Sequence, residues 1–488
     1  MASNNLKRKA ISGTVWSGIH RFGMVLLNFI SGIVLARLLT PHDYGVIGML
    51  TIFLAVCNTF IDGGFGSALI QKKNPTDIDY STILFWNLGL SVFLYFVLFV
   101  CAPFIAKFYN MPLLSTVLRV QGLVLIFNAA RIVQRSQLRK KLLFKKVAII
   151  NVSSNIIALL VTILLAIKGW GVWSLVAQQL LLALLTSIFY WIFSKWKPVM
   201  MFSVGSFKEL FSFGGFILLS NLFNTICNNL EGLLIGKVYN SSTLGYYTKA
   251  RRTEMISSTF ISGLLNQVVY PVFSEVQNDK SRLISVLRKF ITTSAFITFP
   301  LMLLLLLLAK PLFIFLYSER WLDSVPYFQL LCFGGIAICL QDINYYAVAA
   351  IGKSKEMLRW TIVKRLFGIS MLIVGLWLYG IYGVVIGMTI SSWFVYFVNG
   401  GMSAKYVGYK FSQQFKDLAP ILILSIVAFL LSWSVSLFNI GSIYNDALIK
   451  LVVFITSYWL ISVLMKLDTY KSAKETIYYI VKKIKSKI

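Results

Sequence analysis

Residues 82–106 read TILFWNLGLSVFLYFVLFVCAPFIA and contain no charged side chain. An α-helix needs about 20 mostly apolar residues to cross the hydrocarbon core of a bilayer, and this stretch is long enough. We therefore expect residues 82–106 to form a transmembrane helix. The same pattern recurs along the chain, which indicates a protein whose main solvent is lipid.

Thirteen further apolar runs have membrane-spanning length and are separated by short connections. Together they predict an all-α, polytopic membrane bundle of about 14 transmembrane helices. No connection is long enough for an extramembrane catalytic domain, so we do not expect an enzyme. The other runs cover residues 14–38, 44–70, 114–134, 147–167, 170–193, 211–236, 249–273, 290–309, 326–350, 358–379, 381–403, 418–437 and 446–465.

The composition agrees with a membrane protein. Of the 488 residues, 58% are hydrophobic and only 13% are charged, while the net charge is +29. So basic a chain could bind nucleic acid, but its Lys and Arg residues lie in short clusters between apolar runs, as in cytoplasmic loops. We therefore expect no nucleic-acid partner. The five Cys lie inside apolar runs and there are only two His, so we expect no metal and no cofactor.

The basic clusters alternate along the chain. Clusters such as residues 7–9, 139–146, 280–289 and 353–359 fall in every second connection, whereas the connections between them hold few Lys or Arg. Because positively charged loops are retained in the cytoplasm, this alternation predicts an even number of crossings. Both termini should then be cytoplasmic.

An internal repeat relates two parts of the chain. Gly32-Ile-Val-Leu-Ala-Arg37, followed by Gly45, matches Gly232-Leu-Leu-Ile-Gly-Lys237, followed by Gly245, at an offset of 200 residues. Trp170-Gly171-Val172 and Tyr382-Gly383-Val384 form a second matching pair. Parallel repeats of six helices are a transporter architecture, with the substrate path between two lobes. The alternative is a chance likeness, since apolar segments share a small alphabet.

This repeat divides the chain into four expected parts. Residues 1–208 should form an N-terminal lobe of helices 1–6, and residues 209–410 a C-terminal lobe of helices 7–12. Residues 411–465 add two further helices outside the repeat. Residues 466–488 place Ile and Val at helical spacing with Lys between them, which suits an amphipathic helix on the anionic cytoplasmic leaflet. A disordered basic tail is the alternative.

Polar side chains inside the spans indicate a wet interior. The span 211–236 carries Asn221, Asn224, Thr225, Asn228 and Glu231 on one continuous helical face. Such groups are costly in lipid and therefore usually face a cavity. For any single Asn or Thr, a hydrogen bond between helices is the alternative role.

Basic side chains inside the spans indicate an anionic substrate. Arginine forks bind phosphate and pyrophosphate through directional, charge-assisted hydrogen bonds. Arg21 lies well inside the first run, and we predict that it binds a diphosphate group. The candidate substrate-binding residues of this cationic cavity are Arg21, Arg131, Arg135, Lys249, Arg251 and Arg252. The candidate coupling groups or cavity partners are Asp62, Glu231, Asp342, Asn224 and Asn228.

Several segments then resemble a known family. The run LGYYTKA at residues 244–250, followed by YPVFSEVQND at 270–279, resembles the central signature of bacterial polysaccharide flippases of the Wzx type. The runs DGGFGSALIQ at 62–71, FWN at 85–87 and APFIA at 102–106 are similar to the WzxC-like branch. These flippases belong to the multidrug/oligosaccharidyl-lipid/polysaccharide exporter superfamily. The resemblance covers almost the whole chain, in order and at family spacing.

The resemblance implies a function. It implies that the protein moves an undecaprenyl-pyrophosphate-linked oligosaccharide repeat unit across the bacterial inner membrane, by alternating access. The product would be lipopolysaccharide O-antigen, exopolysaccharide or capsule. The implied partners are the lipid-linked oligosaccharide and membrane lipids, with the polysaccharide polymerase machinery as a candidate. The two helices outside the repeat would hold the lipid tail.

Two other functions remain as alternatives. A drug or cation antiporter of the same superfamily usually has twelve helices and more embedded acids than bases, whereas bases dominate here. A membrane-embedded polysaccharide polymerase needs a large periplasmic loop for sugar chemistry, and the predicted outer connections are short.

Overall fold

The structure, a computed structural model, describes residues 2–438 and 441–465, without the side chains of residues 2–15, 17, 19 and 259–268. Every apolar run predicted to be a span falls on helix, and the described residues form no strand, so the predicted all-α fold class is confirmed. The predicted amphipathic tail, residues 466–488, lies outside the described residues. The helices are α1 (Ala2–Leu38), α2 (Pro41–Asp62), α3 (Phe65–Gln71), α4 (Asp77–Phe108), α5 (Leu113–Gln121), α6 (Val124–Lys140), α7 (Phe144–Ile167), α8 (Val172–Ser194), α9 (Val204–Val238), α10 (Ser241–Glu275), α11 (Lys280–Leu307), α12 (Ala309–Tyr317), η1 (Glu319–Ser324), α13 (Val325–Ala350), α14 (Ser354–Tyr406), α15 (Phe411–Ser434), η2 (Val435–Phe438) and α16 (Ile443–Leu464).

Twelve described segments are long and apolar enough to cross a membrane. One of them, residues 354–406, contains a kink at Tyr379 and Gly380 that separates two predicted spans, 358–379 and 381–403. The twelve do not include α10, which has 35 residues and contains residues 259–268, whose side chains are not described.

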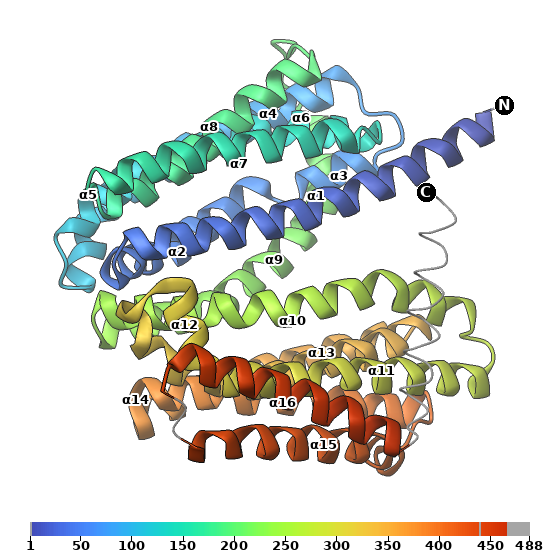
Figure 1. Cartoon of the computed structure of the whole chain (residues 1–488). Helices are drawn as coiled ribbons and strands as arrows, with labels where there is room; N and C mark the ends of the chain where they lie inside the picture. The colour runs from blue at the N-terminus through green and yellow to red at the C-terminus, as the bar shows by residue number, and fades with distance from the viewer. Residues whose placement is uncertain (1, 439–440, 466–488) are drawn as a thin grey trace. The chain divides into compact units, whose positions relative to one another are not determined.

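The chain divides into two compact units, residues 1–248 and residues 249–488. In the first unit, α7 packs against α1 and α8, α6 packs against α4 and α8, and α2 packs along α9 (Figure 1). The division falls inside α10, so that α9 and the first turns of α10 group with the helices before them. The predicted lobes, which divide at residues 208 and 209, stay a prediction.

Two glycines interrupt the span predicted over residues 44–70. Gly63 and Gly64 both have positive φ values, 51° and 71°, and separate α2 from α3. A Cβ on Gly64 would lie only 2.6 Å from the carbonyl oxygen of Gly214 in α9, so no side chain fits there. The break therefore comes from left-handed backbone that glycine tolerates and from close packing on α9.

A reciprocal contact joins the starts of α2 and α10. A Cβ on Gly45 would lie 1.7 Å from the carbonyl oxygen of Ser241, and a Cβ on Gly245 would lie 1.9 Å from that of Pro41. The two contacts exchange residues at the same offset of 200 that relates Gly45 to Gly245 in the sequence. Glycine is required at both positions because the backbones touch, which gives the sequence repeat a structural basis.

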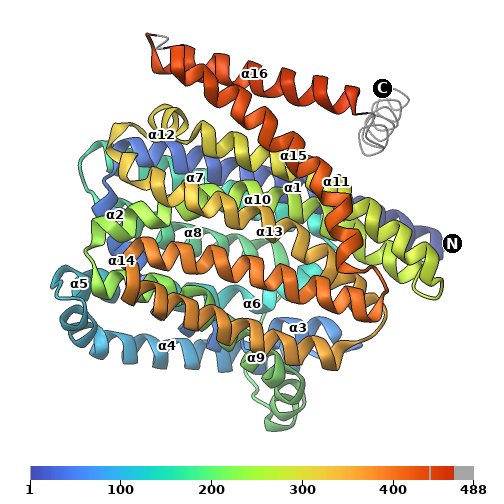
Figure 2. The same ribbon diagram turned by 90° about the horizontal axis from the view of Figure 1, so that it is seen from below.

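In the second unit, α13 packs along α11 and α14, and α15 packs along α11 and α16 (Figure 2). The kink of α14 folds its two halves together. A Cβ on Gly375 would lie 2.1 Å from the carbonyl oxygen of Gly383, and one on Gly383 would lie 1.9 Å from that of Gly375. The two halves therefore pack as antiparallel neighbours at a distance that only glycine allows.

Candidate functional site

Three arginines form a stripe along α6. Arg131, Arg135 and Arg139 are four residues apart and therefore share one helical face. Arg131 and Arg135 were predicted from the sequence, whereas Arg139 was assigned to a cytoplasmic loop. Its spacing from Arg135 is the signal that places it with them. We call these three residues the arginine stripe.

Arg131, the first residue of the arginine stripe, is held by α8. Nη1 of Arg131 donates a hydrogen bond to Oγ1 of Thr186 over 2.7 Å. One turn away on α6, Nδ2 of Asn128 donates to Oδ1 of Asn58 on α2 over 2.8 Å. These bonds fix the side of α6 that carries the stripe. Arg135, the middle member, is exposed.

Asp62 lies near the stripe, at the end of α2. The glycine at position 66 leaves room for it, because a Cβ there would lie 3.4 Å from both Oδ1 of Asp62 and Oγ of Ser136 on α6. Arg139 interacts electrostatically with Asp62 and with Arg135. The structure thus brings together two predicted cations, a third cation and one predicted acidic partner.

Arg21 is exposed on α1. Helix α1 starts at Ala2, well before the predicted start at residue 14, so Arg21 lies near the middle of a long helix. Its neighbour His20 interacts electrostatically with Arg139. The side of α1 that carries His20 therefore faces the Arg139 end of the arginine stripe. The predicted contact of Arg21 with a diphosphate stays a prediction.

Lys249 on α10 is enclosed by aromatic rings. Its Nζ lies 3.9 Å from the ring centroid of Tyr317 and 5.4 Å from that of Trp321. Oγ1 of the neighbouring Thr253 lies 3.0 Å from Oη of Tyr317, within hydrogen-bond distance. Lys249 is 4% exposed, so it differs from Arg252, which is exposed on the same helix. The substrate contact predicted for Lys249 would require this aromatic enclosure to open.

Arg251 approaches an acid that sequence reasoning missed. Nη1 of Arg251 lies 3.7 Å from Oε2 of Glu254, and the side chain of Glu254 is fully buried. The sequence signal was an acidic residue three positions after an arginine inside a predicted span. The prediction for this segment rested on its cations and did not include Glu254.

Asp342 on α13 belongs to a second polar cluster of this unit. Its charge acts on Lys364 of α14, which is 8% exposed. Nζ of Lys364 donates to Oδ1 of Asn399 over 2.9 Å and lies 5.5 Å from the ring centroid of Tyr345. Nδ2 of Asn399 donates in turn to the carbonyl oxygen of Gln341. This cluster joins the two halves of α14 to α13.

The polar face predicted on α9 is only partly exposed. Oγ1 of Thr225 lies 3.0 Å from Oγ1 of Thr59, so this residue joins α9 to α2, as a hydrogen bond between helices would require. Asn228 is exposed, while Asn224 and Glu231 are half-buried. The cavity roles of these three residues stay predictions.

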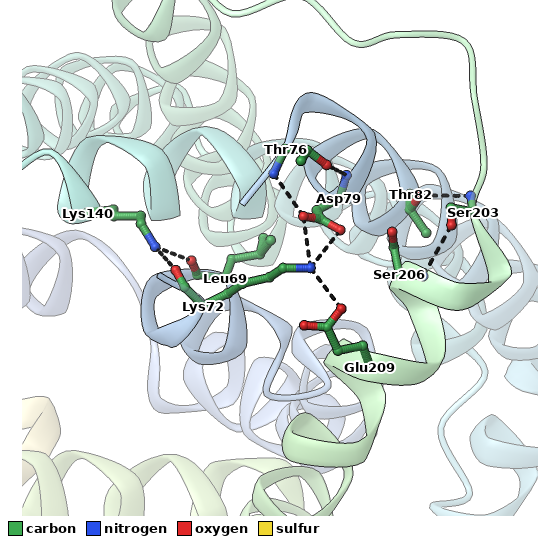
Figure 3. A network of polar contacts seen from close by, with 9 residues as sticks. All are labelled: Leu69, Lys72, Thr76, Asp79, Thr82, Lys140, Ser203, Ser206 and Glu209. Carbon is green, nitrogen blue, oxygen red and sulfur yellow. Dashed lines mark hydrogen bonds and ion pairs between the residues drawn. The ribbon is translucent and has the colours of Figure 1, made fainter. Parts of the chain in front are cut away.

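A separate ion-pair network holds the first turns of α9 against α4 (Figure 3). Nζ of Lys72 lies 3.0 Å from Oδ2 of Asp79 and 2.9 Å from Oε2 of Glu209. Asp79 also accepts a 2.8 Å hydrogen bond from the backbone N–H of Thr76, the N-cap of α4. Lys140, after the arginine stripe, donates to the carbonyl oxygens of Leu69 and Ile70, both at 3.1 Å, and to that of Lys72.

Burial and the two neighbouring acids act in opposite directions on the pKa of Lys72. Burial lowers the pKa, but the hydrogen bonds and negative charges of Glu209 and Asp79 raise it more, so the pKa of Lys72 lies above its usual 10.5. The ammonium group is therefore held in its charged form. This network fastens α9 to α4, whereas the middle member of the arginine stripe, Arg135, is exposed.

Comparison with known proteins identifies the family. Residues 34–326, more than half of the chain, match the family described as polysaccharide biosynthesis protein. The chain belongs to this family. It is 26% identical to the teichuronic acid biosynthesis protein TuaB of Bacillus subtilis over 81% of this chain and 84% of TuaB. It is 23% identical to the lipopolysaccharide biosynthesis protein WzxC of Escherichia coli over 80% of this chain and 81% of WzxC.

Solved structures agree on the fold. The inward closed structure of the lipid II flippase MurJ aligns with a TM-score of 0.75 and 16% identity, covering 93% of this chain and all of MurJ. An inward-facing multidrug resistance transporter of the MATE family and the MOP superfamily aligns with a TM-score of 0.62 and 17% identity, covering 78% of this chain and 94% of that one. This polysaccharide biosynthesis protein is therefore a multi-pass membrane protein with the fold of MOP-superfamily transporters, as the resemblance predicted.

Proposed function

We propose that this protein is a flippase that moves a lipid-linked oligosaccharide repeat unit, carried on undecaprenyl pyrophosphate, by alternating access. Its membership of the polysaccharide biosynthesis family and its likeness to TuaB and WzxC support the product class. The MurJ-like fold supports a transport function rather than a reaction on the sugar. The same proposal makes the lipid-linked oligosaccharide and membrane lipids its partners, with the polymerase machinery as a further partner.

The arginine stripe is the observation that carries the proposal. Successive members are about 6 Å apart along the helix, since each residue adds about 1.5 Å. A diphosphate could therefore pass from one guanidinium to the next while keeping a bidentate contact. An embedded stripe of bases suits an anionic cargo and disfavours a cationic drug, because like charges repel.

The proposal includes an orientation of the protein in the membrane. We propose that the protein lies in the bacterial inner membrane with both termini in the cytoplasm, as the alternating basic loops predict. Reporter fusions at Asn74, Lys140 and Asp279 should then be cytoplasmic. Fusions at His42 and Tyr239 should be periplasmic. An interior pair of reporters found on the wrong sides would contradict this orientation.

The deciding experiment deletes the gene and expresses variants at matched protein levels. Wild type should restore surface polysaccharide, and the deletion should accumulate a lipid-linked oligosaccharide that mass spectrometry can identify. We expect Arg135→Gln to reduce export about tenfold or more and Arg135→Lys to reduce it less, because lysine keeps the charge and loses the fork. Arg119→Gln is the matched control, since Arg119 lies over the ring of Phe99 on α4, 4.5 Å from its centroid.

Two results would contradict the proposal. Normal polysaccharide and no precursor accumulation in the deletion strain would remove the flippase function. Equal export by Arg135→Gln, Arg131→Gln and the Arg119→Gln control would keep the flippase but remove the arginine stripe from its path. The contacts predicted for Arg21, Arg251 and Arg252 can be compared in the same assay.

A further inference from the structure

One carboxyl group of the second unit is buried without the contacts that a charge needs. Glu254 lies thirteen residues after Ser241, the first residue of α10, which is roughly 20 Å along the helix axis. Its side chain is 0% exposed, and no hydrogen bond of good geometry reaches either carboxylate oxygen from the described residues. The groups that act on it from its own helix are Arg251 and the hydroxyl of Ser258. Buried polar groups are normally hydrogen-bonded, so this one requires an explanation.

The carboxyl group of Glu254 lies among apolar and sulfur-containing side chains. A Cβ on Gly335 of α13 would lie 2.8 Å from Oε1 of Glu254 and 3.0 Å from Sδ of Met302 on α11. Cys332, one turn before Gly335, is fully buried and interacts electrostatically with Glu254. The glycine at position 335 thus leaves the space that the carboxyl group fills, between a thioether and a thiol.

The charge of Glu254 is only partly compensated. Arg251 faces it from its own helix at 3.7 Å, which is beyond hydrogen-bond distance, and Arg251 is 29% exposed. Cys332 is the titratable group that faces it from α13, and Met302 of α11 carries no titratable group. The other two cations of this segment are Lys249, which is directed to Tyr317, and Arg252, which is exposed. Burial in such a site favours the neutral acid over the carboxylate, and Arg251 opposes it only in part.

We propose that Glu254 is a proton-binding site of the transport cycle, neutral when enclosed as seen here and ionised when its surroundings open to water. The proposal rests on the flippase function proposed above and names the ion that drives it. A proton passes from periplasmic water to a carboxylate oxygen of Glu254, and the neutral group is then enclosed. On opening to the cytoplasm, the proton returns to water and the carboxylate pairs with Arg251.

This sequence of steps links a proton to the return of the empty carrier. An ionised Glu254 would cost several kcal/mol to enclose in an apolar site, whereas the neutral acid would not. Protonation therefore permits the enclosed state, and an inward proton gradient favours the step that resets the carrier. The lipid-linked anion moves outward in the other half of the cycle.

The first test observes the proton directly. Infrared difference spectra of the full-length protein in lipid nanodiscs, titrated from about pH 5 to about pH 9, should show the carbonyl band of a protonated, buried carboxylic acid. The band should vanish in Glu254→Gln and persist in Glu275→Gln, the matched control at the exposed end of the same helix. A band unchanged in Glu254→Gln, or no such band in wild type, would overturn the proposal.

The second test measures coupling. Proteoliposomes with fluorescent undecaprenyl pyrophosphate as the probe should flip it severalfold faster under an imposed proton gradient. Glu254→Gln should lose this stimulation, whereas Glu254→Asp, which keeps the carboxyl group, should retain part of it. Full stimulation in Glu254→Gln would overturn the proposal. If wild type moves no probe at all, the flippase function fails, while the infrared titration still decides the protonation of Glu254.

Discussion

Asp79 and Glu254 are both buried acids, but their surroundings differ. The side chain of Asp79 is 2% exposed, and its carboxylate is paired with Lys72 at 3.0 Å and bonded to the backbone of Thr76 (Figure 3). The side chain of Glu254 is 0% exposed, and its only described ion-pair partner, Arg251, lies 3.7 Å away. One acid is surrounded by donors, while the other faces Gly335, Met302 and Cys332.

The difference separates a structural acid from a functional one. A buried charge that is paired and hydrogen-bonded holds its elements in one arrangement, and here it fastens α4 to the start of α9. A buried acid whose charge is only partly compensated contributes less to stability, and we attribute the presence of Glu254 to the change of protonation proposed above. The following measurements test this difference between the two acids.

The largest effect is expected for Asp79→Ala. The substitution removes the partner of Lys72 and the acceptor of the Thr76 N–H, so we expect a loss of about 3 kcal/mol. Glu209 remains to pair with Lys72, which limits the loss. Thermal unfolding can be followed with a thiol-reactive fluorophore once the half-buried Cys101 is replaced by serine, because the other four cysteines are buried and react only on unfolding. These are Cys57, Cys227, Cys332 and Cys339. An unchanged melting temperature would show that the network does not hold α9.

A smaller effect is expected at alkaline pH. The pKa of Lys72 is raised in the folded state, so its contribution is fully present below its usual value of 10.5 and is lost as the pH rises through the folded pKa. The difference in melting temperature between wild type and Lys72→Met should therefore narrow above about pH 10.5. Taking the difference cancels the titration of the other lysines. A constant difference through about pH 11.5 would contradict this assignment.

The sequence predicted the helices better than their ends. Every apolar run predicted to be a span lies on helix. A helix that crosses the lipid must be both long and apolar, and both properties can be recognised in the sequence. The interruption at Gly63 and Gly64 was missed, since glycine also occurs inside membrane helices and only the φ values and the contact with Gly214 show a break. Helix α1 extends before the predicted span 14–38, because its first residues are polar and do not belong to the apolar run.

The candidate site was predicted in part. Arg131, Arg135 and Asp62 were predicted from the sequence, and the structure adds Arg139, which interacts electrostatically with both Arg135 and Asp62. Glu254 could not be separated from other acids in sequence, because its lack of donors depends on Gly335 and Met302, which are distant along the chain. The aromatic enclosure of Lys249 likewise depends on α12 and η1, which follow it by more than sixty residues.

Glu254→Gln should change stability by less than about 1 kcal/mol, in contrast to Asp79→Ala. Glutamine has the shape of the neutral acid and can still accept a hydrogen bond from the hydroxyl of Ser258, while only the 3.7 Å contact of Arg251 loses its charge. The melting temperature in the same thiol-reactive assay should therefore stay close to that of wild type at pH 7. A fall as large as that of Asp79→Ala would mean that the charge of Glu254 is structurally required, and the contrast between the two acids would disappear.

The smallest effect is expected for the second acid of the Lys72 network. Glu209 is as close to Lys72 as Asp79 is, but its side chain is 62% exposed. Exposed ion pairs contribute only about 0–1 kcal/mol because water and salt screen them. A double-mutant cycle of Lys72→Met with Glu209→Gln should therefore give a small coupling energy that vanishes in about 0.5 M salt, since the Debye length falls as ionic strength rises. The cycle of Lys72→Met with Asp79→Asn should give a larger coupling that persists in salt, because the carboxylate of Asp79 is shielded from solvent and held by Thr76. Equal couplings for Glu209 and Asp79 would show that burial, on which the contrast between Asp79 and Glu254 rests, does not set the strength of these pairs.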